Sequence, residues 1–166
     1  MVGTVYKVQP QPPEQEHTRW FDAGPLRFGV EYRHVDPAAL EATYAGNAED
    51  MAEIVENSPE GGFFDQGVSI HVCGLADGHE YLRFDVFDDE PHYHYVSPSG
   101  DHNNVVEFDV VAQGPMFPWV LDRVRYQLRP MLVKASGAAL ADQVDDAALA
   151  DAVVTLERMA EEARRV

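Results

Sequence analysis

Histidines and carboxylates occur at alternating positions in the middle of this chain. His92 and His94 flank Tyr93, and Arg83 and Asp85 stand at the same spacing. Residues two apart in an extended strand project from the same side, so each pair presents its side chains together. Imidazoles and carboxylates bind zinc, iron, manganese and nickel, and they also act as general acids and bases. The spacing therefore predicts either a metal site or a proton-transfer site.

The alternation extends over four candidate strands between residues 67 and 111, with the sequences GVSIHVC, EYLRFDVF, HYHYV and NVVEFDVV. Turn sequences containing Gly, Pro, Asp and Ser separate these strands, which predicts an antiparallel meander. One face of the sheet is apolar throughout and suits burial under helices. The opposite face, called here the polar face, includes two further residues if the strand at residues 26–35 joins the sheet. The polar face comprises Ser69, His71, Cys73, Arg83, Asp85, His92, His94, Glu107 and Asp109, with Glu31 and Arg33 from the first strand.

The lengths of the turns predict which of these residues meet. Each hairpin takes its register from its connection. These connections are a tight two-residue turn within DDEP, a three- or five-residue loop around the DG step, and the SPSGDH loop. The expected neighbours are Asp85 with His94, His71 with Arg83 or Asp85, and Glu107 with His92 or His94. Cross-strand neighbours lie about 5 Å apart, so we expect these groups to lie within reach of one another.

This cluster fits two kinds of chemistry. As a metal site, its ligands would be His71, His92, His94 and Glu107, and the ion would be divalent zinc, manganese, iron or nickel. As a metal-free site, Asp85 and Glu107 would orient His94 and keep it basic, as a general base requires. The substrate would then be bound by Arg83, Arg33 and Glu31, since guanidinium groups can hold a carboxylate with two hydrogen bonds.

A third interpretation assigns no chemistry to the polar face. An antiparallel sheet with one solvated face carries polar residues there, and pairing across strands accounts for alternating Arg, Asp, His and Glu. The leading hypothesis is a small-molecule-binding domain or enzyme that uses the cluster. The alternative is a non-catalytic accessory or homo-oligomeric protein, or a subunit of a larger enzyme complex, in which this face and the N-terminal residues contact a partner.

The elements that position the cluster predict an α+β fold. Residues 1–19, the N-terminal arm, contain three prolines among Gln and Glu, which favours an extended segment, while residues 20–166 form one domain. After the strand at residues 26–35, Asp36-Pro37 begins a helix that ends at Ser58-Pro59. Helical periodicity returns after Gly114 and continues almost to the end of the chain. We expect an antiparallel meander of about five strands, one helix inserted after the first strand, and C-terminal helices on the apolar face.

Composition narrows the partners and the compartment. The chain of 166 residues has 29 acidic and 12 basic residues and a formal net charge of −17, which repels nucleic acids and anionic membranes. No stretch approaches the roughly 18 apolar residues of a transmembrane helix, and the N-terminus lacks the apolar segment of a secretory signal. A single cysteine allows no intrachain disulfide. These features predict a cytoplasmic protein with no nucleic acid or membrane partner.

Overall fold

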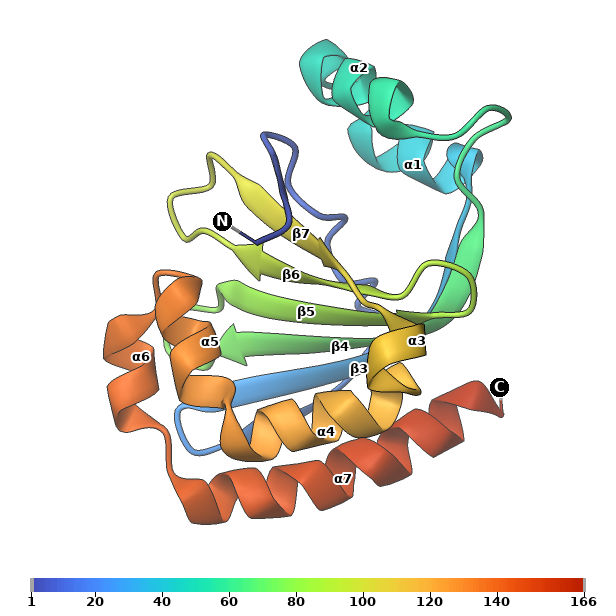
Figure 1. Cartoon of the computed structure of the whole chain (residues 1–166). Helices are drawn as coiled ribbons and strands as arrows, with labels where there is room; N and C mark the ends of the chain where they lie inside the picture. Colours follow the sequence, from blue (N-terminus) through green and yellow to red (C-terminus); the bar gives the residue numbers. More distant parts are fainter. Residues whose placement is uncertain (1, 166) are drawn as a thin grey trace.

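Seven antiparallel strands form one continuous sheet in the computed structural model, which describes residues 2–165 (Figure 1). Strands β2 to β7 follow one another as a meander, and β1 pairs with β7 at the edge opposite β2. The strands are β1 (Thr4–Tyr6), β2 (Arg19–Ala23), β3 (Leu26–Val35), β4 (Asp65–Gly74), β5 (Glu80–Phe87), β6 (His92–Val96) and β7 (Asn103–Glu107). The predicted α+β class with its antiparallel meander is confirmed, although the sheet has seven strands where about five were expected.

The two additional strands lie at the edges of the sheet. β2 forms a tight hairpin with β3, closed by Gly24 and Pro25, and Gly24 adopts a positive φ of 59° that suits glycine. β1 is three residues long and pairs with β7 from Thr4 opposite Val105. A strand this short shows too little alternation to be predicted from sequence.

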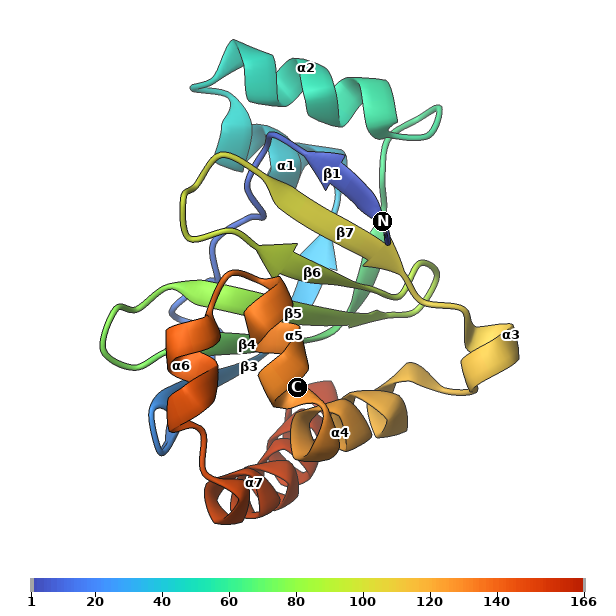
Figure 2. The same ribbon diagram turned by 60° about the vertical axis from the view of Figure 1, so that its left-hand side comes forward.

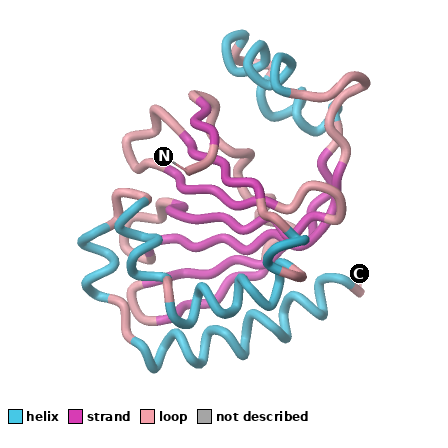
Figure 3. Tube along the Cα trace, viewed as in Figure 1, coloured by secondary structure: helices cyan, strands magenta, loops and turns pink. Residues whose placement is uncertain are grey.

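Helices in the last third of the chain cover the apolar face of the sheet, as Figures 1 and 3 show. They are α3 (Val110–Gln113), α4 (Met116–Tyr126), α5 (Leu128–Lys134), α6 (Ala138–Gln143) and α7 (Asp146–Arg164). The break between α4 and α5 at Gln127 follows from Pro130, which cannot donate a hydrogen bond to the carbonyl of Tyr126. None of the helices within residues 2–165 combines the length and the apolar character needed to cross a membrane.

Two helices, α1 (Pro37–Tyr44) and α2 (Ala48–Asn57), stand where one long helix was predicted. Asn47 ends the continuity because its side chain accepts hydrogen bonds from the backbone N–H groups of Glu49 and Asp50, both at 3.1 Å, and so caps α2. Neither helix buries a residue completely. Figure 2 shows them apart from α4–α7, above β1 and β7.

The N-terminal arm includes β1 and the first residue of β2, and between them it crosses the polar face. The side-chain amide of Gln11 donates to Thr43 Oγ1 at 2.8 Å and to the Ala39 carbonyl at 3.2 Å, which joins the arm to α1. The Glu53 carboxylate accepts from the backbone N–H of Val8 at 2.7 Å, which joins the arm to α2. The arm and the two helices therefore form a second layer over the polar side of the sheet.

Candidate functional site

The polar face is buried by the protein itself. Glu31, His71, Arg83 and Asp85 are each no more than 1% exposed. Part of the cover is Trp20, whose ring centroid lies 6.0 Å from that of His71. Its position requires the glycine at residue 29, because a Cβ there would lie 2.6 Å from the Trp20 ring. Such burial is costly for ionisable groups unless they are paired, so the pairing within this face determines what each residue can do.

Three of these residues form a closed ion network with Glu80 on β3, β4 and β5. His71 Nε2 lies 2.8 Å from Glu31 Oε1, and His71 Nδ1 contacts Glu80 Oε2. Arg83 Nη2 lies 2.7 Å from Glu80 Oε1 and also donates to the carbonyl of Gln11 in the arm. Since both ring nitrogens of His71 face carboxylates, the protonated imidazolium suits the position. His71 is thus engaged by its neighbours and is not brought to His92 and His94.

The pKa values of the network follow from this pairing. Burial lowers the pKa of His71, but the charge of Glu80 and the hydrogen bonds to Glu31 and Glu80 outweigh burial, so the pKa is raised above its ordinary value. Burial raises the pKa of Glu80, but the charges of Arg83 and His71 outweigh it and lower this pKa to about 2. Both shifts favour a cationic His71 beside an anionic Glu80.

The charge of His71 predicts a pH-dependent stability. Because its folded-state pKa lies above the ordinary value of 6.5, its contribution is complete below that pH and is lost as the pH rises through the folded-state pKa. The free energy of unfolding of the wild type should therefore exceed that of His71→Gln most in mildly acidic solution, and the difference should shrink in alkaline solution. Urea unfolding of both proteins across this range measures it. A difference that stays constant with pH would contradict the charged state of His71.

Glu80 was not among the predicted site residues because strict alternation places it on the apolar face with Leu82. The β4–β5 register changes between Val72 and Cys73: Val72 pairs with Leu82, but Cys73 pairs with Glu80. Tyr81 is the extra residue of this bulge, and the bulge turns Glu80 to the polar face.

A second cluster consists of Asp85, His92 and His94, which each offer one ligand atom within 4.8 Å of the others. Asp85 Oδ2 lies 2.9 Å from His94 Nε2 and 3.0 Å from His92 Nε2. The predicted pairing of Asp85 opposite His94 is corrected by two positions: Asp85 lies opposite His92, and Arg83 opposite His94. A shift of two leaves every side chain on its predicted face.

The wider β5–β6 loop that causes this shift is held by Asp65 from β4. Its carboxylate accepts hydrogen bonds from the backbone N–H groups of Asp89, at 3.0 Å, and Glu90, at 2.8 Å. Asp65 lies far from this loop in sequence, so the turn residues alone could not show that a longer loop would be preferred.

The Nδ1 atoms of both histidines also have hydrogen-bond partners. His94 Nδ1 lies 3.0 Å from Asn103 Oδ1, and His92 Nδ1 lies 2.8 Å from the carbonyl of Glu90. The other oxygen of Asp85 accepts a hydrogen bond from Ser69 and lies 3.7 Å from Arg33 Nη1. The three side chains are thus fixed in orientation, with both Nε2 atoms directed at one carboxylate oxygen.

The three groups have different proton affinities. Burial raises the pKa of Asp85, but hydrogen bonds with His92 and His94 outweigh it and hold this pKa well below the usual range. Burial lowers the pKa of His92, but Asp85 outweighs it and the pKa is raised. Burial also lowers the pKa of His94, and here Asp85 offsets only part of the effect, so the pKa stays lowered. Asp85 is therefore an anion that orients two histidines of unequal basicity.

Glu107 lies opposite His92 in the β6–β7 register, as the loop length predicted, but it is exposed. Within residues 2–165 its carboxylate forms no hydrogen bond or ion pair. Asn103, at the other end of β7 and on the same face, contacts His94 instead. Alternation along residues 103, 105 and 107 places Asn103 on the polar face. An amide is a weaker indication of a metal or proton-transfer site than a carboxylate, so Asn103 was not predicted.

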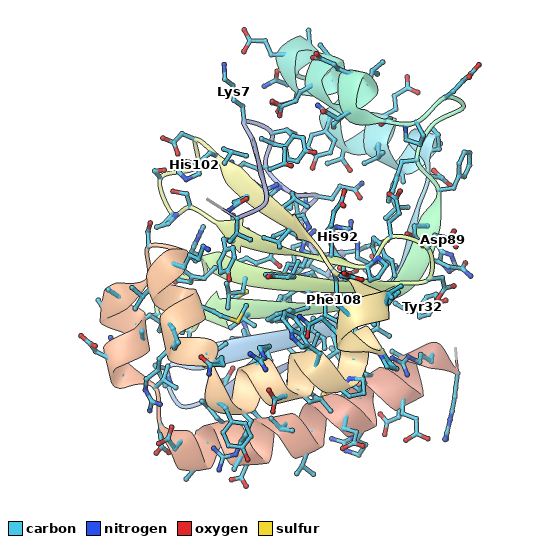
Figure 4. The ribbon with its side chains drawn as sticks, viewed as in Figure 1. Lys7, Tyr32, Asp89, His92, His102 and Phe108 are labelled. Atoms are coloured by element: carbon cyan, nitrogen blue, oxygen red, sulfur yellow. The ribbon has the colours of Figure 1, made fainter. Side chains whose placement is uncertain are left out.

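A cavity of about 220 Å³ lies between the Asp85 cluster and the layer of the arm, α1 and α2. Its floor includes Asp85, His92 and His94, and Arg33 and Arg83 lie beside them. Its roof includes the apolar side chains of Val8, Leu40, Ile54 and Phe63, with the ring of Tyr44 beside them. In Figure 4, His92 lies over the sheet, away from the exposed His102 in the β6–β7 loop. The cavity thus joins a charged floor to an apolar roof.

Comparison with models of protein families gives a match. A family model described as a domain of unknown function (DUF7700) matches residues 20–160, which include β3–β7, α1–α6 and the Asp85 cluster. Searches of curated proteins and of solved structures found no match.

Proposed function

The chain belongs to the DUF7700 family of domains of unknown function, and we propose that it is a small-molecule-binding domain or enzyme whose ligand occupies the cavity over Asp85, His92 and His94. The observation that supports this proposal most strongly is the cavity itself, which brings oriented ionisable groups together with an apolar wall. Concave sites of this mixed character are typical of small-molecule binding. Perturbed pKa values in such a site also point to function.

The cavity limits the size and character of the ligand. Its volume of about 220 Å³ is below the roughly 300–1,000 Å³ of sites for drug-sized molecules, so the ligand is a small metabolite. The apolar roof favours a hydrocarbon portion. The floor favours a polar or anionic group because Arg33 lies there. Its Nη2 donates to Gln11 Oε1 at 2.6 Å, while its ion pairs are loose, at 3.6 Å to Glu31 and 3.7 Å to Asp85. An amphipathic carboxylic acid suits both walls.

The alternative function, protein contact through the polar face, gains no support from this arrangement. Contact between copies through that face would require the arm, α1 and α2 to leave it, and would expose the paired charges of Glu31, His71 and Arg83. No observation at this face favours a protein partner over a small ligand.

Filling the cavity tests the proposal. Ile54 lines the cavity from α2, while the adjacent Val55 is 65% exposed. In a thermal-shift panel of small carboxylic acids of increasing chain length, wild type and Val55→Trp should be stabilised by the same acids. Ile54→Trp should lose about 2.7 kcal/mol of that stabilisation, the linkage energy expected at a ligand concentration near 100 times Kd. Equal shifts in both tryptophan variants, or no shift in the wild type, would contradict binding in this cavity.

A further inference from the structure

We propose that Asp85, His92 and His94 form a binding site for one divalent transition-metal ion, with open coordination positions that face the cavity. The metal site uses the same cluster as the proposed function. The role of the metal in binding a carboxylic acid rests on the proposed function, but the existence of the site does not. Metal binding itself can be measured without any organic ligand.

The spacing of the three ligand atoms fits metal coordination. Metal bonds to imidazole nitrogen and carboxylate oxygen are about 2.0–2.2 Å long, which places adjacent ligand atoms roughly 3.0–3.4 Å apart. Asp85 Oδ2 lies 2.9 Å from His94 Nε2 and 3.0 Å from His92 Nε2. Both separations that involve Asp85 thus match those of adjacent ligands on one ion, and all three ligand atoms lie within 4.8 Å of one another.

The orientation of the histidines carries the inference further. The Nδ1 atom of each ring faces a hydrogen-bond acceptor. For His92 this is the carbonyl oxygen of Glu90, and for His94 it is Oδ1 of Asn103. Because Nδ1 keeps its proton against that oxygen, Nε2 is the nitrogen that gives up a proton when an ion binds, and its lone pair is then directed to the side of Asp85. In the metal-free protein, Nε2 protons fill this place as hydrogen bonds to Asp85. An ion that replaces these protons would meet two nitrogen lone pairs and a carboxylate oxygen that converge on one point. Holding Nδ1 in this way is also how proteins orient histidine ligands of metals.

The surrounding charges leave Asp85 available to the ion. Arg83 is paired with Glu80, and Arg33 lies between Glu31 and Asp85 without a close hydrogen bond to either. Glu53, which also lines the cavity, is engaged by backbone N–H groups of the arm.

Two imidazoles and one carboxylate are the ligand set of catalytic zinc and of mononuclear iron(II) sites, both of which keep positions open for water or substrate. The predicted ligand set of His71, His92, His94 and Glu107 thus becomes Asp85, His92 and His94. An ion here would leave its free positions toward the cavity, where a carboxylate ligand could reach both the metal and Arg33.

The test is equilibrium dialysis of untagged, chelator-treated protein against Zn²⁺, Mn²⁺ or anaerobic Fe²⁺, with the metal content read by elemental analysis. The wild type should bind one ion of at least one metal per chain. His92→Ala should weaken that binding at least about 100-fold, more than the loss typical of residues that only support a ligand. His92 is chosen because it is half-buried, and circular dichroism would verify that the variant folds.

Two surface variants serve as matched controls. Glu107→Gln changes the exposed carboxylate opposite His92, and His102→Ala removes an exposed histidine from the β6–β7 loop; both should bind metal as the wild type does. Replacing the ion with Co²⁺ should give visible absorption bands in the wild type that His92→Ala lacks. Absent binding, or equal binding in His92→Ala, would overturn the site.

The Ile54→Trp variant separates this inference from the proposed function. It fills the cavity but touches no proposed metal ligand, so it should bind the ion normally while losing the carboxylic acids. Metal binding without any acid binding would leave the site standing and remove the proposed ligand. Acid binding by a protein that takes up no metal would support the proposed ligand and overturn the metal site.

Discussion

Replacing Arg83 with methionine should lower the free energy of unfolding by about 3–5 kcal/mol, the loss expected when one partner of a buried ion pair is removed. The guanidinium is 1% exposed and lies 2.7 Å from Glu80, and it also donates to the Gln11 carbonyl. Methionine has a similar length but no charge, so Glu80 would lose its main counter-charge in a site closed to water. Urea unfolding measures the change.

An exposed arginine of the same sheet provides the control. Arg27 on β3 is half-exposed and lies 3.4 Å from Asp22, so Arg27→Met should change the free energy of unfolding by no more than about 1 kcal/mol. The double variant Arg83→Met with Glu80→Gln should recover part of the loss, because the stranded carboxylate is removed as well. A loss below about 1 kcal/mol for Arg83→Met would show that water reaches Glu80 and that the network is not closed.

Alternation along the strands predicted the faces of the sheet because period two depends only on local geometry. It placed His71, Arg83, Asp85 and His94 on one face, and the structure places them there. The polar face was expected to be a pocket, a solvated surface or a protein interface. Its actual cover comes from the arm and from Trp20, and no local pattern records that long-range contact.

The grouping of residues within that face depended on contacts distant in sequence. The bulge at Val72 and Cys73 brought Glu80 to His71, and Asp65 widened the β5–β6 loop. These two features split the predicted cluster into a closed ion network and the open Asp85 cluster. Turn sequences indicate where a hairpin reverses, but the preferred loop length depends on which distant groups satisfy its backbone.

The buried site contributes little to the net negative charge of the chain. The network and the Asp85 cluster together contain three carboxylates, Glu31, Glu80 and Asp85, and they face Arg33, Arg83 and the imidazolium of His71. With histidine counted as neutral, the three carboxylates and two guanidinium groups give this set a charge of −1, so −16 of the formal net charge of −17 arises elsewhere in the chain. The acidic residues that give the chain its charge therefore lie outside the site. A metal ion at Asp85 would make the cavity floor cationic and suited to an anionic ligand.

Deleting residues 2–16 should destabilise the protein by at least about 3 kcal/mol, the sum of one buried aliphatic side chain and two or more buried hydrogen bonds. By its composition the arm is predicted to contribute little, because three prolines and few apolar residues bury little surface. In the structure Val8 is buried, Gln11 accepts from Arg83, and the Glu14 backbone N–H lies 3.4 Å from Glu31. Removing these contacts would open the ion network to water.

A point variant distinguishes loss of the cover from loss of the edge strand. Val5 lies in β1 and is 47% exposed, so Val5→Asp should change stability by less than about 1 kcal/mol, while Val8→Asp should approach the effect of the deletion. The deletion should also abolish carboxylic acid binding, since Val8 and Gln11 line the cavity. Metal binding should persist in weakened form, because Asp85, His92 and His94 come from β5 and β6 and need no residue of the arm as a ligand. A deletion variant as stable as the wild type would show that the polar face is covered by something other than the arm.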